Sequence, residues 1–265
     1  MELNIQHLES TINYSVEGNG VTLVLLHGFC EDKTIWDDFK LPLLSKYKVI
    51  TIDLPGFGKS LSGTKHTSME LMAEAVHAVL NEEKIEKSFL LGHSMGGYVT
   101  LAFAEKYSTL LKGIGLFHSS CFADEEPKKV IRKKVADFVL KNGSRQFIYE
   151  LFPTLFTPEY ADSHKEQIQL IEEQAALLRP ESIANGSTAM CNRKDFSNLL
   201  SETTLPVLII IGKKDLAIPF ERGLSMAHLP KAPFICLLKN TAHMGMFEEP
   251  EKSRKAIDDW VSLAD

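Results

Sequence analysis

The sequence predicts an α/β fold, in which helices cover both faces of a mostly parallel β-sheet. From residue 21 onward, short apolar runs rich in β-branched residues alternate with stretches that have helical periodicity. Continuous apolar runs of this kind are typical of parallel strands that are buried on both faces. A long helix-rich interval, from about residue 121 to 200, interrupts the alternation before it resumes.

The first quarter of the chain is expected to form a sheet edge and two buried strands. Polar and apolar residues alternate at the N-terminus, with Gly18 and Gly20 near the end of the stretch, which predicts an edge β-hairpin. A crossover helix broken by Pro42 should join the strands, and Thr67 is the expected N-cap of the next helix. The expected elements are strands at 21–27 and 48–53 and helices within 31–46 and 67–84.

The rest of the chain continues the alternation on both sides of the helix-rich interval. A structureless loop of that length is improbable, so we expect a helical cap at 121–200, inserted into a core formed by 1–120 and 201–265. The cap should lie over the carboxyl edge of the sheet, where α/β proteins bind ligands. The expected strands are 87–92, 112–119, 205–212 and 232–239, and the expected helices are 95–107, 219–228 and 248–264.

Composition and charge exclude several classes of function. Hydrophobic residues make up 44% and charged residues 24% of the 265 residues, as in globular proteins rather than disordered or fibrous ones. The chain carries 29 lysines and arginines against 35 acidic residues, a net charge of -6. Because this charge repels polyanions, we expect a small-molecule substrate and neither nucleic acid nor a membrane surface as partner.

The cysteines and the N-terminal residues predict a cytoplasmic protein. Four cysteines lie far apart, with no CxxC pair and no histidine at metal-finger spacing, so free thiols and no metal site are expected. The first twenty residues contain no apolar segment long enough for a signal peptide. The longest apolar runs reach only about a third of the length of a membrane helix.

The segment FLLGHSMGGYVTLAF, residues 89–103, predicts an exposed nucleophile at Ser94. A serine between strand and helix is often only an N-cap, but a nucleophile at a sharp strand-to-helix turn needs small residues two positions to either side. Gly92 and Gly96 supply them. The turn also places Ser94 at a helix N-terminus, where the amide of Met95 can stabilise an oxyanion.

A serine nucleophile requires a base and a group that orients the base. His243 follows the last predicted strand and Asp215 follows the strand before it, so both should emerge at the same edge as Ser94. Gly28 lets the chain turn after an early strand, which would aim the amide of Phe29 at the same point.

Five stretches together resemble the α/β-hydrolase superfamily over essentially the whole chain. The resemblance implies the α/β-hydrolase fold with an inserted helical cap, a triad of Ser94, Asp215 and His243, and an oxyanion hole from the amides of Phe29 and Met95. It implies no cofactor. The stretches are HGF at 27–29, DLPGFGKS at 53–60, GHSMGG at 92–97, GKKD at 212–215 and AHMGMFEEP at 242–250.

Other residues near these motifs have competing interpretations. Asp124 is an alternative triad acid, and His27 and His93 are expected to satisfy nearby backbone groups rather than act as the base. The basic run at 128–134 is interpreted as a solvated helix face rather than an anion site, and DLPGFGKS as a turn bonded by Asp53 rather than a phosphate loop. Candidates for the substrate pocket are Cys30, His118, Met190, Arg193 and Met244.

The motifs predict hydrolysis of a small or medium carboxylic ester or thioester through an acyl-enzyme. Carbon–carbon hydrolases of the fold are the next candidates, although they usually carry asparagine and tryptophan where this chain has His93 and Met244. In those relatives a cap arginine binds a substrate carboxylate, and Arg193 is the candidate here. A lyase of the same fold and a slow-turnover ligand receptor remain open alternatives.

Overall fold

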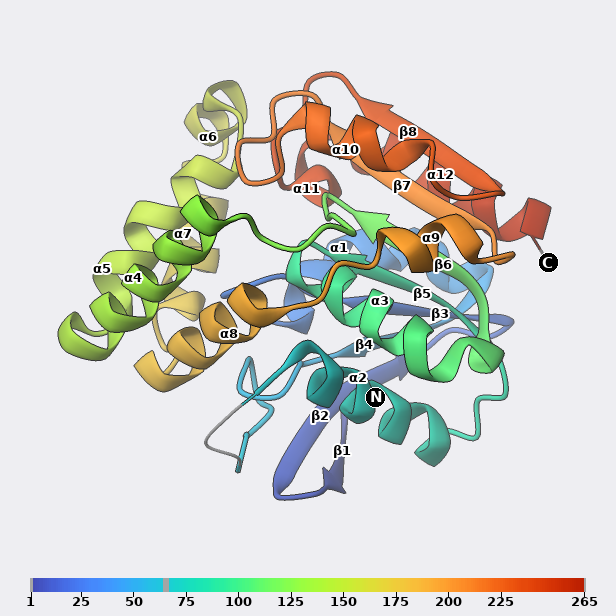
Figure 1. The fold of residues 1–265 in the computed structure, drawn as a ribbon, viewed down its shortest axis with the longest axis horizontal. Coiled ribbons are helices and arrows are strands. Elements are labelled where there is room, and N and C mark those ends of the chain that lie inside the picture. The colour runs from blue at the N-terminus through green and yellow to red at the C-terminus, as the bar shows by residue number, and fades with distance from the viewer. Residues whose placement is uncertain (1, 64–66, 265) are drawn as a thin grey trace.

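Eight strands form a single sheet in the computed structural model, which describes residues 2–63 and 67–264 (Figure 1). The strand order is β1-β2-β4-β3-β5-β6-β7-β8, and every pairing is parallel except β1–β2 and β2–β4. The strands are β1 (Glu2–His7), β2 (Ser10–Glu17), β3 (Val21–Leu26), β4 (Tyr47–Ile52), β5 (Ser88–His93), β6 (Leu111–Phe117), β7 (Val207–Gly212) and β8 (Pro233–Leu238).

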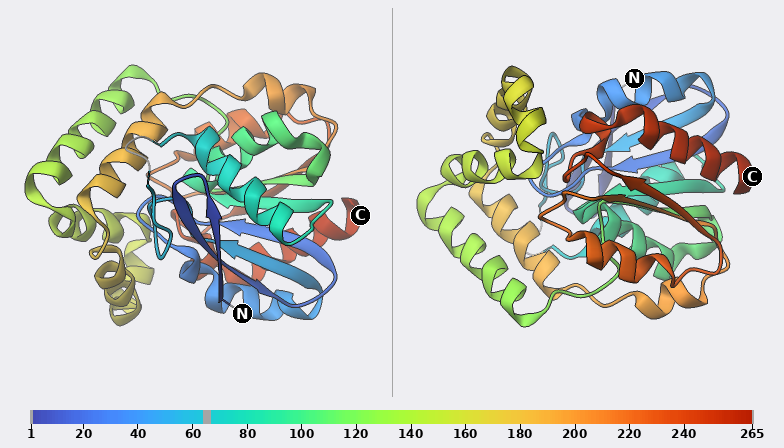
Figure 2. Two further views of the ribbon diagram at one scale, coloured as in Figure 1. Left: turned by 90° about the horizontal axis from the view of Figure 1, so that it is seen from below. Right: turned by 90° about the horizontal axis from the view of Figure 1, so that it is seen from above.

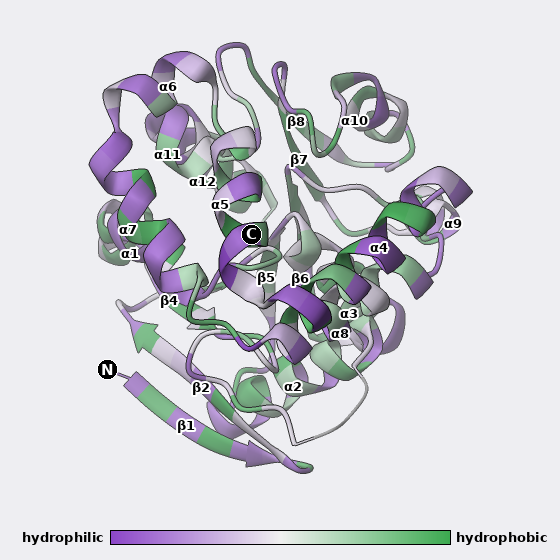
Figure 3. Cartoon of the chain, turned by 90° about the vertical axis from the view of Figure 1, so that its left-hand side faces the viewer, coloured by the Kyte–Doolittle hydropathy of each residue, from purple (hydrophilic) through white to green (hydrophobic). Residues whose placement is uncertain are grey.

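The edge hairpin and the central strands differ in burial as the sequence pattern predicts. Residues of β1 alternate between exposed and half-buried, and the bands of this strand in Figure 3 show the matching alternation of polar and apolar residues. All residues of β5 and β7 are buried, because helices cover both faces there. The hairpin turns at Leu8, whereas Gly18 and Gly20 lie beyond β2, where a side chain at either position would strike backbone carbonyls.

Helices cover the two faces of the sheet separately. α2 (Met69–Glu82), α3 (Met95–Tyr107) and α10 (Phe220–Ala227) contribute to one buried hydrophobic cluster, while α1 (Asp37–Lys40) and α12 (Pro250–Ala264) contribute to the other. The short helices α9 (Ser197–Glu202) and α11 (Gly245–Glu248) contribute Leu200 to the first cluster and Met246 to the second. A hydrophobic cluster is therefore packed on each face of the sheet. The carboxyl ends of the strands are the part of the sheet where a site can form.

Two local predictions are corrected. The N-cap of α2 is Ser68 rather than Thr67, because the Ser68 hydroxyl accepts the Leu71 amide directly before the first helical turn. The expected helix within 31–46 is three short pieces, η1 (Lys33–Trp36), α1 and η2 (Leu41–Ser45). Pro42 lies at the start of η2, where its missing amide is tolerated.

A further set of helices lies beyond the carboxyl ends of the strands (Figure 2). We call these helices, residues 126–192, the α4–α8 layer. The helix-rich interval that the sequence shows at 121–200 contains several separate helices. The layer comprises α4 (Glu126–Asn142), α5 (Ser144–Leu151), η4 (Phe152–Leu155), α6 (Pro158–Ser163), α7 (Lys165–Ala175) and α8 (Pro180–Asn192).

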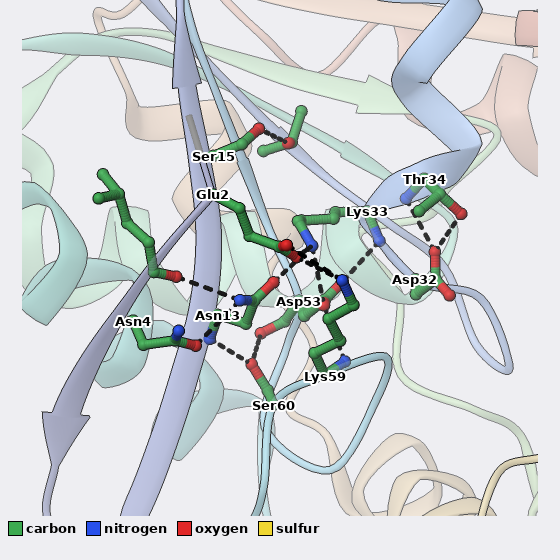
Figure 4. Close-up of polar contacts among 12 residues, drawn as sticks. Glu2, Asn4, Asn13, Ser15, Asp32, Lys33, Thr34, Asp53, Lys59 and Ser60 are labelled. Atoms are coloured by element: carbon green, nitrogen blue, oxygen red, sulfur yellow. Dashed lines mark hydrogen bonds and ion pairs between the residues drawn. The ribbon is translucent and has the colours of Figure 1, made fainter.

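The DLPGFGKS loop is held by internal hydrogen bonds (Figure 4). The Asp53 carboxylate accepts the amides of Lys33 and Lys59 at 2.7 and 2.9 Å. The Ser60 hydroxyl donates to the Asp53 carbonyl and accepts the Asn13 amide, which ties the loop to the edge hairpin. The Lys59 amide and the Ser60 hydroxyl, which could otherwise bind a phosphate, therefore both donate to Asp53 within the turn.

No helix within residues 2–63 and 67–264 combines the length and apolar character needed to cross a bilayer.

Candidate active site

Ser94 occupies a strained turn between β5 and α3. Its backbone angles are φ 49° and ψ -112°, a region that side-chain-bearing residues rarely adopt. A Cβ at Gly92 would collide with the backbone of Gly96, and a Cβ at Gly96 would lie 2.6 Å from the carbonyl oxygen of His27. The two glycines therefore allow the close approach that projects Ser94 beyond the strand.

His243 and Asp215 form a buried pair at the ends of neighbouring strands. His243 Nδ1 lies 2.7 Å from Asp215 Oδ2, and the two residues are 3% and 5% exposed. Asp215 Oδ1 accepts the amides of Ala217 and Ile218 at 2.8 and 2.9 Å. Burial alone would raise the pKa of Asp215, but His243 and the hydrogen bonds it receives hold that pKa well below its usual value.

Ser94 and His243 line one cavity of about 220 Å³ beneath the α4–α8 layer. Most of its wall is apolar, with contributions from α5, η4, α8 and the loop after β7. Such a cavity, apolar with a few convergent polar groups, is typical of a small-molecule site. The polar or charged side chains that line it are Glu31, Ser94, Tyr98, Lys128, Arg132 and His243.

A second cavity of about 450 Å³ lies beside the first, and Glu31 lines both. It is bounded by α7, the start of α8 and the loop after β3, and it contains neither Ser94 nor His243. We assign the chemistry to the smaller cavity because the nucleophile candidate and the base candidate meet there.

The two candidate oxyanion donors lie on either side of Ser94. Phe29 lines the cavity, and Met95 is the first residue of α3, where helix amides lack intrahelical partners. Neither amide donates to another residue within the described ranges. A Cβ at position 28 would lie 2.8 Å from both Glu31 Oε2 and His93 Nδ1, so only glycine fits at this position without a clash.

A buried Glu31–His93 pair supports the Gly28–Phe29 loop, and sequence reasoning missed it. His93 Nδ1 faces Glu31 Oε2 at 3.0 Å, and its Nε2 faces the carbonyl oxygen of His243 at 2.9 Å. The His243 carbonyl can only accept, so Nε2 carries a proton, and with Glu31 ionised Nδ1 carries one too, which makes His93 an imidazolium. Glu31 Oε2 also accepts the Gly28 amide at 2.6 Å, so the pair connects the Gly28–Phe29 loop with the loop that carries His243.

The pKa shifts of this pair agree with the geometry. Burial opposes both charges, yet Glu31 and its hydrogen bond raise the pKa of His93 above its usual value. Burial would likewise raise the pKa of Glu31, but His93 and the Gly28 amide lower it overall. The sequence shows Glu31 within HGFCED and His93 directly before Ser94, but the two are 62 positions apart, and only the fold shows that they meet.

His118 lies behind Asp215 rather than in the cavity of Ser94. Its Nδ1 accepts the Gly212 amide at 3.1 Å and lies 3.4 Å from Asp215 Oδ2. Burial lowers the pKa of His118 to about 4, although Asp215 acts in the opposite direction. His118 is therefore a neutral neighbour of the candidate acid.

The remaining pocket candidates are divided between several places. Met190 lines the cavity of Ser94, whereas Cys30 lines the larger cavity beside it. Met244 is fully buried in the hydrophobic cluster with α12. Arg193 lies outside both cavities, with its guanidinium 3.9 Å from the Tyr98 ring centroid and bonded to Asp124 at 2.9 Å. Asp124 is thus engaged by Arg193, away from His243.

His27 bonds to backbone groups, as expected from its position. Its Nε2 accepts the Leu54 amide at 3.0 Å, and Nδ1 faces the Gly28 carbonyl at 2.8 Å. This arrangement ties the oxyanion loop to the end of β4 and leaves neither ring nitrogen of His27 free to act as a base.

The basic run at 128–134 does not form a uniformly solvated face. Lys133 and Lys134 are exposed, but Lys128 and Arg132 turn inward and line the cavity of Ser94. Their spacing of four residues places them on the same side of α4, one turn apart. The expectation of a solvated helix face is therefore wrong for these two residues.

No group of three or more histidine, cysteine or acidic residues within the described ranges is placed to hold a metal ion.

Comparisons with known proteins agree on the family. A model of the alpha/beta hydrolase family matches residues 23–256. The pimeloyl-[acyl-carrier protein] methyl ester esterase of Aeromonas hydrophila is 30% identical, covering 94% of this chain and 100% of that protein. The 2-hydroxy-6-oxononadienedioate/2-hydroxy-6-oxononatrienedioate hydrolase of Paraburkholderia phymatum is 28% identical, covering 96% and 91%.

Among solved structures, a thermophilic esterase from Thermogutta terrifontis, determined with malate bound, superimposes with a TM-score of 0.94. It is 29% identical, and the match covers 100% of this chain and 99% of that one. The enol-lactonase from Burkholderia xenovorans shares the fold at 20% identity, with a TM-score of 0.88 over 96% and 97% of the two chains. The chain belongs to the alpha/beta hydrolase family, has the α/β-hydrolase fold and is an enzyme of that family.

Proposed function

We propose that this enzyme hydrolyses a small or medium carboxylic ester or thioester through an acyl-enzyme on Ser94. The observation that carries the proposal is the hydrogen bond between His243 and Asp215, formed at the wall of the cavity that also contains Ser94. The proposed catalytic residues are Ser94, Asp215 and His243. The amides of Phe29 and Met95 form the proposed oxyanion hole.

The first half of the reaction forms the acyl-enzyme. His243 Nε2 takes the proton from Ser94 Oγ as Oγ attacks the ester carbon, and the carbonyl oxygen becomes an oxyanion that the two amides stabilise. Collapse of this intermediate breaks the bond to the alcohol, which leaves with the proton from His243. The transfer requires Ser94 Oγ and His243 Nε2 to reach hydrogen-bond distance, and such pairs often tighten only with substrate bound.

The second half releases the acid. Water gives a proton to His243 Nε2 and attacks the acyl carbon. The second tetrahedral intermediate then collapses as His243 Nε2 returns this proton to Ser94 Oγ, which releases the carboxylic acid and restores Ser94. Asp215 supports both halves because its Oδ2 faces His243 Nδ1. That contact keeps a proton on Nδ1 and leaves Nε2 free to accept one.

The α4–α8 layer is proposed to act as the cap of this site, inserted between core segments 1–120 and 201–265. Support comes from the cavity, because α4, α5 and α8 all contribute to the wall opposite Ser94. A cytoplasmic location is inferred from the four cysteines, which are all free thiols.

Carbon–carbon bond hydrolysis is the second candidate, favoured by the 28% identical relative that is named for such a substrate. Against it, Arg193 bonds to Asp124 outside the cavity instead of facing Ser94. A panel of 4-nitrophenyl esters and a vinylogous 1,5-diketone separates the two candidates by kcat/KM. Sustained turnover of either class also excludes a slow receptor.

The proposal is tested by Ser94→Ala. We expect kcat on 4-nitrophenyl butyrate to fall by about 10⁴-fold or more, while circular dichroism and the unfolding temperature stay unchanged. A fluorophosphonate probe should label the wild type at Ser94 and fail to label the variant. Undiminished ester turnover by a folded Ser94→Ala protein would remove Ser94 from the mechanism.

A further inference from the structure

We propose that Lys128 and Arg132 form an anion subsite, which binds a carboxylate that the substrate carries in addition to its ester. The preferred substrates would then be half-esters of dicarboxylic acids or esters of hydroxy acids, rather than neutral esters. This inference rests on the proposed ester hydrolysis and names its substrate class.

The position of the two cations carries the first part of the argument. Both side chains line the cavity of about 220 Å³ that contains Ser94 and His243. They lie one turn apart near the start of α4, so they reach the cavity from the side opposite the sheet. A carboxylate on one end of a substrate can therefore contact them while the ester end lies at Ser94.

The local charge balance carries the second part. Asp124 is shared by two guanidinium groups, at 3.2 Å from Arg132 Nε and 2.9 Å from Arg193 Nη2. The Nη groups of Arg132 make no hydrogen bond to any residue that the structure describes. Asp124 therefore divides its negative charge between two guanidinium groups.

Lys128 is the less compensated of the two cavity cations. Its Nζ donates to the carbonyl oxygen of Ala217 at 2.8 Å, and within residues 2–63 and 67–264 no carboxylate lies within 4.0 Å of it. Among the residues that the structure describes, Glu31 is the one acidic residue that lines this cavity, and it is already paired with His93. Within that part of the chain, no carboxylate pairs with Lys128.

A half-buried ammonium in this position is unfavourable without an anion. Burial and the neighbouring Arg132 lower the pKa of Lys128 to about 8, against the opposing effect of Asp124. Lysines that serve only solubility remain in water, as Lys133 and Lys134 do on the same helix. A bound carboxylate would remove the imbalance, and charge-assisted hydrogen bonds to a guanidinium and an ammonium are among the stronger ones.

The competing interpretation is purely structural. Lys128 could serve to hold Ala217, whose amide bonds Asp215 Oδ1, and thereby fix the loop of the candidate acid. Removing the ammonium would then lower the turnover of every ester alike. An anion subsite instead predicts a loss confined to substrates that carry a carboxylate, and this difference decides the experiment.

The test compares charged and neutral esters of matched length. Monomethyl and dimethyl glutarate form one pair, and acetoxyacetate and its methyl ester form the other, which places the carboxylate on the acid or the alcohol side. We expect wild-type kcat/KM to favour the charged member of at least one pair by about tenfold or more. Lys128→Met and Arg132→Met should each remove most of that preference, by about 10- to 50-fold, because kcat/KM for the charged member falls much more than kcat/KM for the neutral member.

Lys133→Met is the matched control, since it removes an exposed lysine from the same helix and should leave both ratios unchanged. A preference for neutral esters in the wild type, or an equal loss on both members of a pair, would overturn the subsite. If the wild type turns over no ester at all, the proposed function fails instead.

Binding without turnover gives an independent readout. Monomethyl glutarate should bind Ser94→Ala, measured by titration calorimetry, and the uncharged dimethyl glutarate should bind at least tenfold more weakly. Adding Lys128→Met to Ser94→Ala should abolish the difference between the two esters. Equal affinities for monomethyl and dimethyl glutarate in Ser94→Ala would overturn the subsite whatever the outcome with turnover.

Discussion

The two walls of the Ser94 cavity differ in how their charges are balanced. On the wall formed by the sheet, each carboxylate has one cationic or hydrogen-donating histidine partner, Asp215 with His243 and Glu31 with His93. On the wall formed by α4, Arg132 shares Asp124 with Arg193, and Lys128 has no carboxylate within 4.0 Å in the described part of the chain. We call the first the reacting wall, because its carboxylates are paired with histidines. We call the second the binding wall, because its cations can still pair with an anion from the substrate.

The carboxylates of the reacting wall are also held by several backbone amides, whereas on the binding wall the Lys128 ammonium has one backbone contact, to the Ala217 carbonyl oxygen. Asp215 Oδ1 accepts two amides, and Glu31 Oε2 accepts the Gly28 amide in addition to its contact with His93. Paired charges with saturated hydrogen bonds hold catalytic groups in one geometry. The cations of α4 lie on flexible side chains, which suits recognition of a substrate group more than positioning of a reacting atom.

The largest effect is expected from Asp215→Asn on the reacting wall. Because Oδ1 accepts two amides, the asparagine oxygen should occupy that position and turn its NH₂ group toward His243 Nδ1. Nδ1 must then accept, the proton moves to Nε2, and His243 can no longer take the proton of Ser94. We expect kcat on 4-nitrophenyl butyrate to fall by about 10³- to 10⁴-fold.

The control for Asp215→Asn is Asp124→Asn, which changes the other acid that sequence reasoning considered. Asp124 bonds Arg193 and Arg132 and does not contact His243, so neutral-ester turnover should fall by less than tenfold. The reverse order of the two effects would assign the acid to Asp124.

A smaller effect is expected from Glu31→Gln, which leaves His93 without its carboxylate. Glu31 is a positioning residue, since it holds the oxyanion loop at Gly28 and reaches His243 only through His93. We expect kcat to fall by about 10- to 100-fold with KM nearly unchanged, as for a weakened oxyanion hole. Asp38→Asn, an exposed neighbour, is the control, and a rise in KM without a change in kcat would contradict this role.

The pH dependence of stability gives Glu31→Gln a second readout. The lowered pKa of Glu31 stabilises the fold above its usual value of about 4.5, and the raised pKa of His93 stabilises it below about 6.5. The pair contributes fully between these values, and its contribution falls as pH drops through the folded pKa of Glu31 or rises through that of His93. Chemical denaturation of wild type and variant should therefore differ most between about pH 4.5 and 6.5.

These two walls also differ in how far the sequence predicted them. The reacting wall follows chain-order rules, because Ser94, Asp215 and His243 each follow a predicted strand, and parallel strands end at one edge. The glycines around Ser94 are constrained by backbone contact that any such turn must make. Strand periodicity thus placed the candidate triad without knowledge of side-chain packing.

The residues of the binding wall depend on which side of α4 faces the cavity, and the sequence did not predict that side. In α4, charged residues occupy nearly every side of the first two turns, so no apolar stripe marks the buried face. Lys128 and Arg132 became inward-facing only through the packing of α4 on α8, for example through the Ser187 hydroxyl bonded to the Arg132 carbonyl. The Glu31–His93 pair was hidden for a similar reason, because 62 positions separate its members.

A several-fold effect of pH on specificity is expected for the binding wall. The ammonium of Lys128, whose pKa is lowered to about 8, loses its proton between pH 7 and 9. The other charges near it are Arg132, Arg193, Arg222 and Asp124, which stay ionised in this range. The ratio of kcat/KM for monomethyl over dimethyl glutarate should therefore fall across this interval in the wild type and stay flat in Lys128→Met. A parallel decline in both proteins would assign the titration to another group.

The smallest effect is a gain of stability in Lys128→Met. A lysine whose folded pKa lies below its unfolded value destabilises the fold while it is charged, fully below about pH 8 and no longer above about pH 10.5. Because water still reaches this half-buried side chain, we expect a gain of about 1–2 kcal/mol in the free energy of unfolding at pH 7, which should vanish near pH 10.5. Urea denaturation measures it, with Lys133→Met expected within about 0.5 kcal/mol of the wild type. A stability gain together with a loss of half-ester specificity would show that Lys128 is kept for binding at the expense of the fold, whereas a loss of stability would mean that its bond to Ala217 is structural.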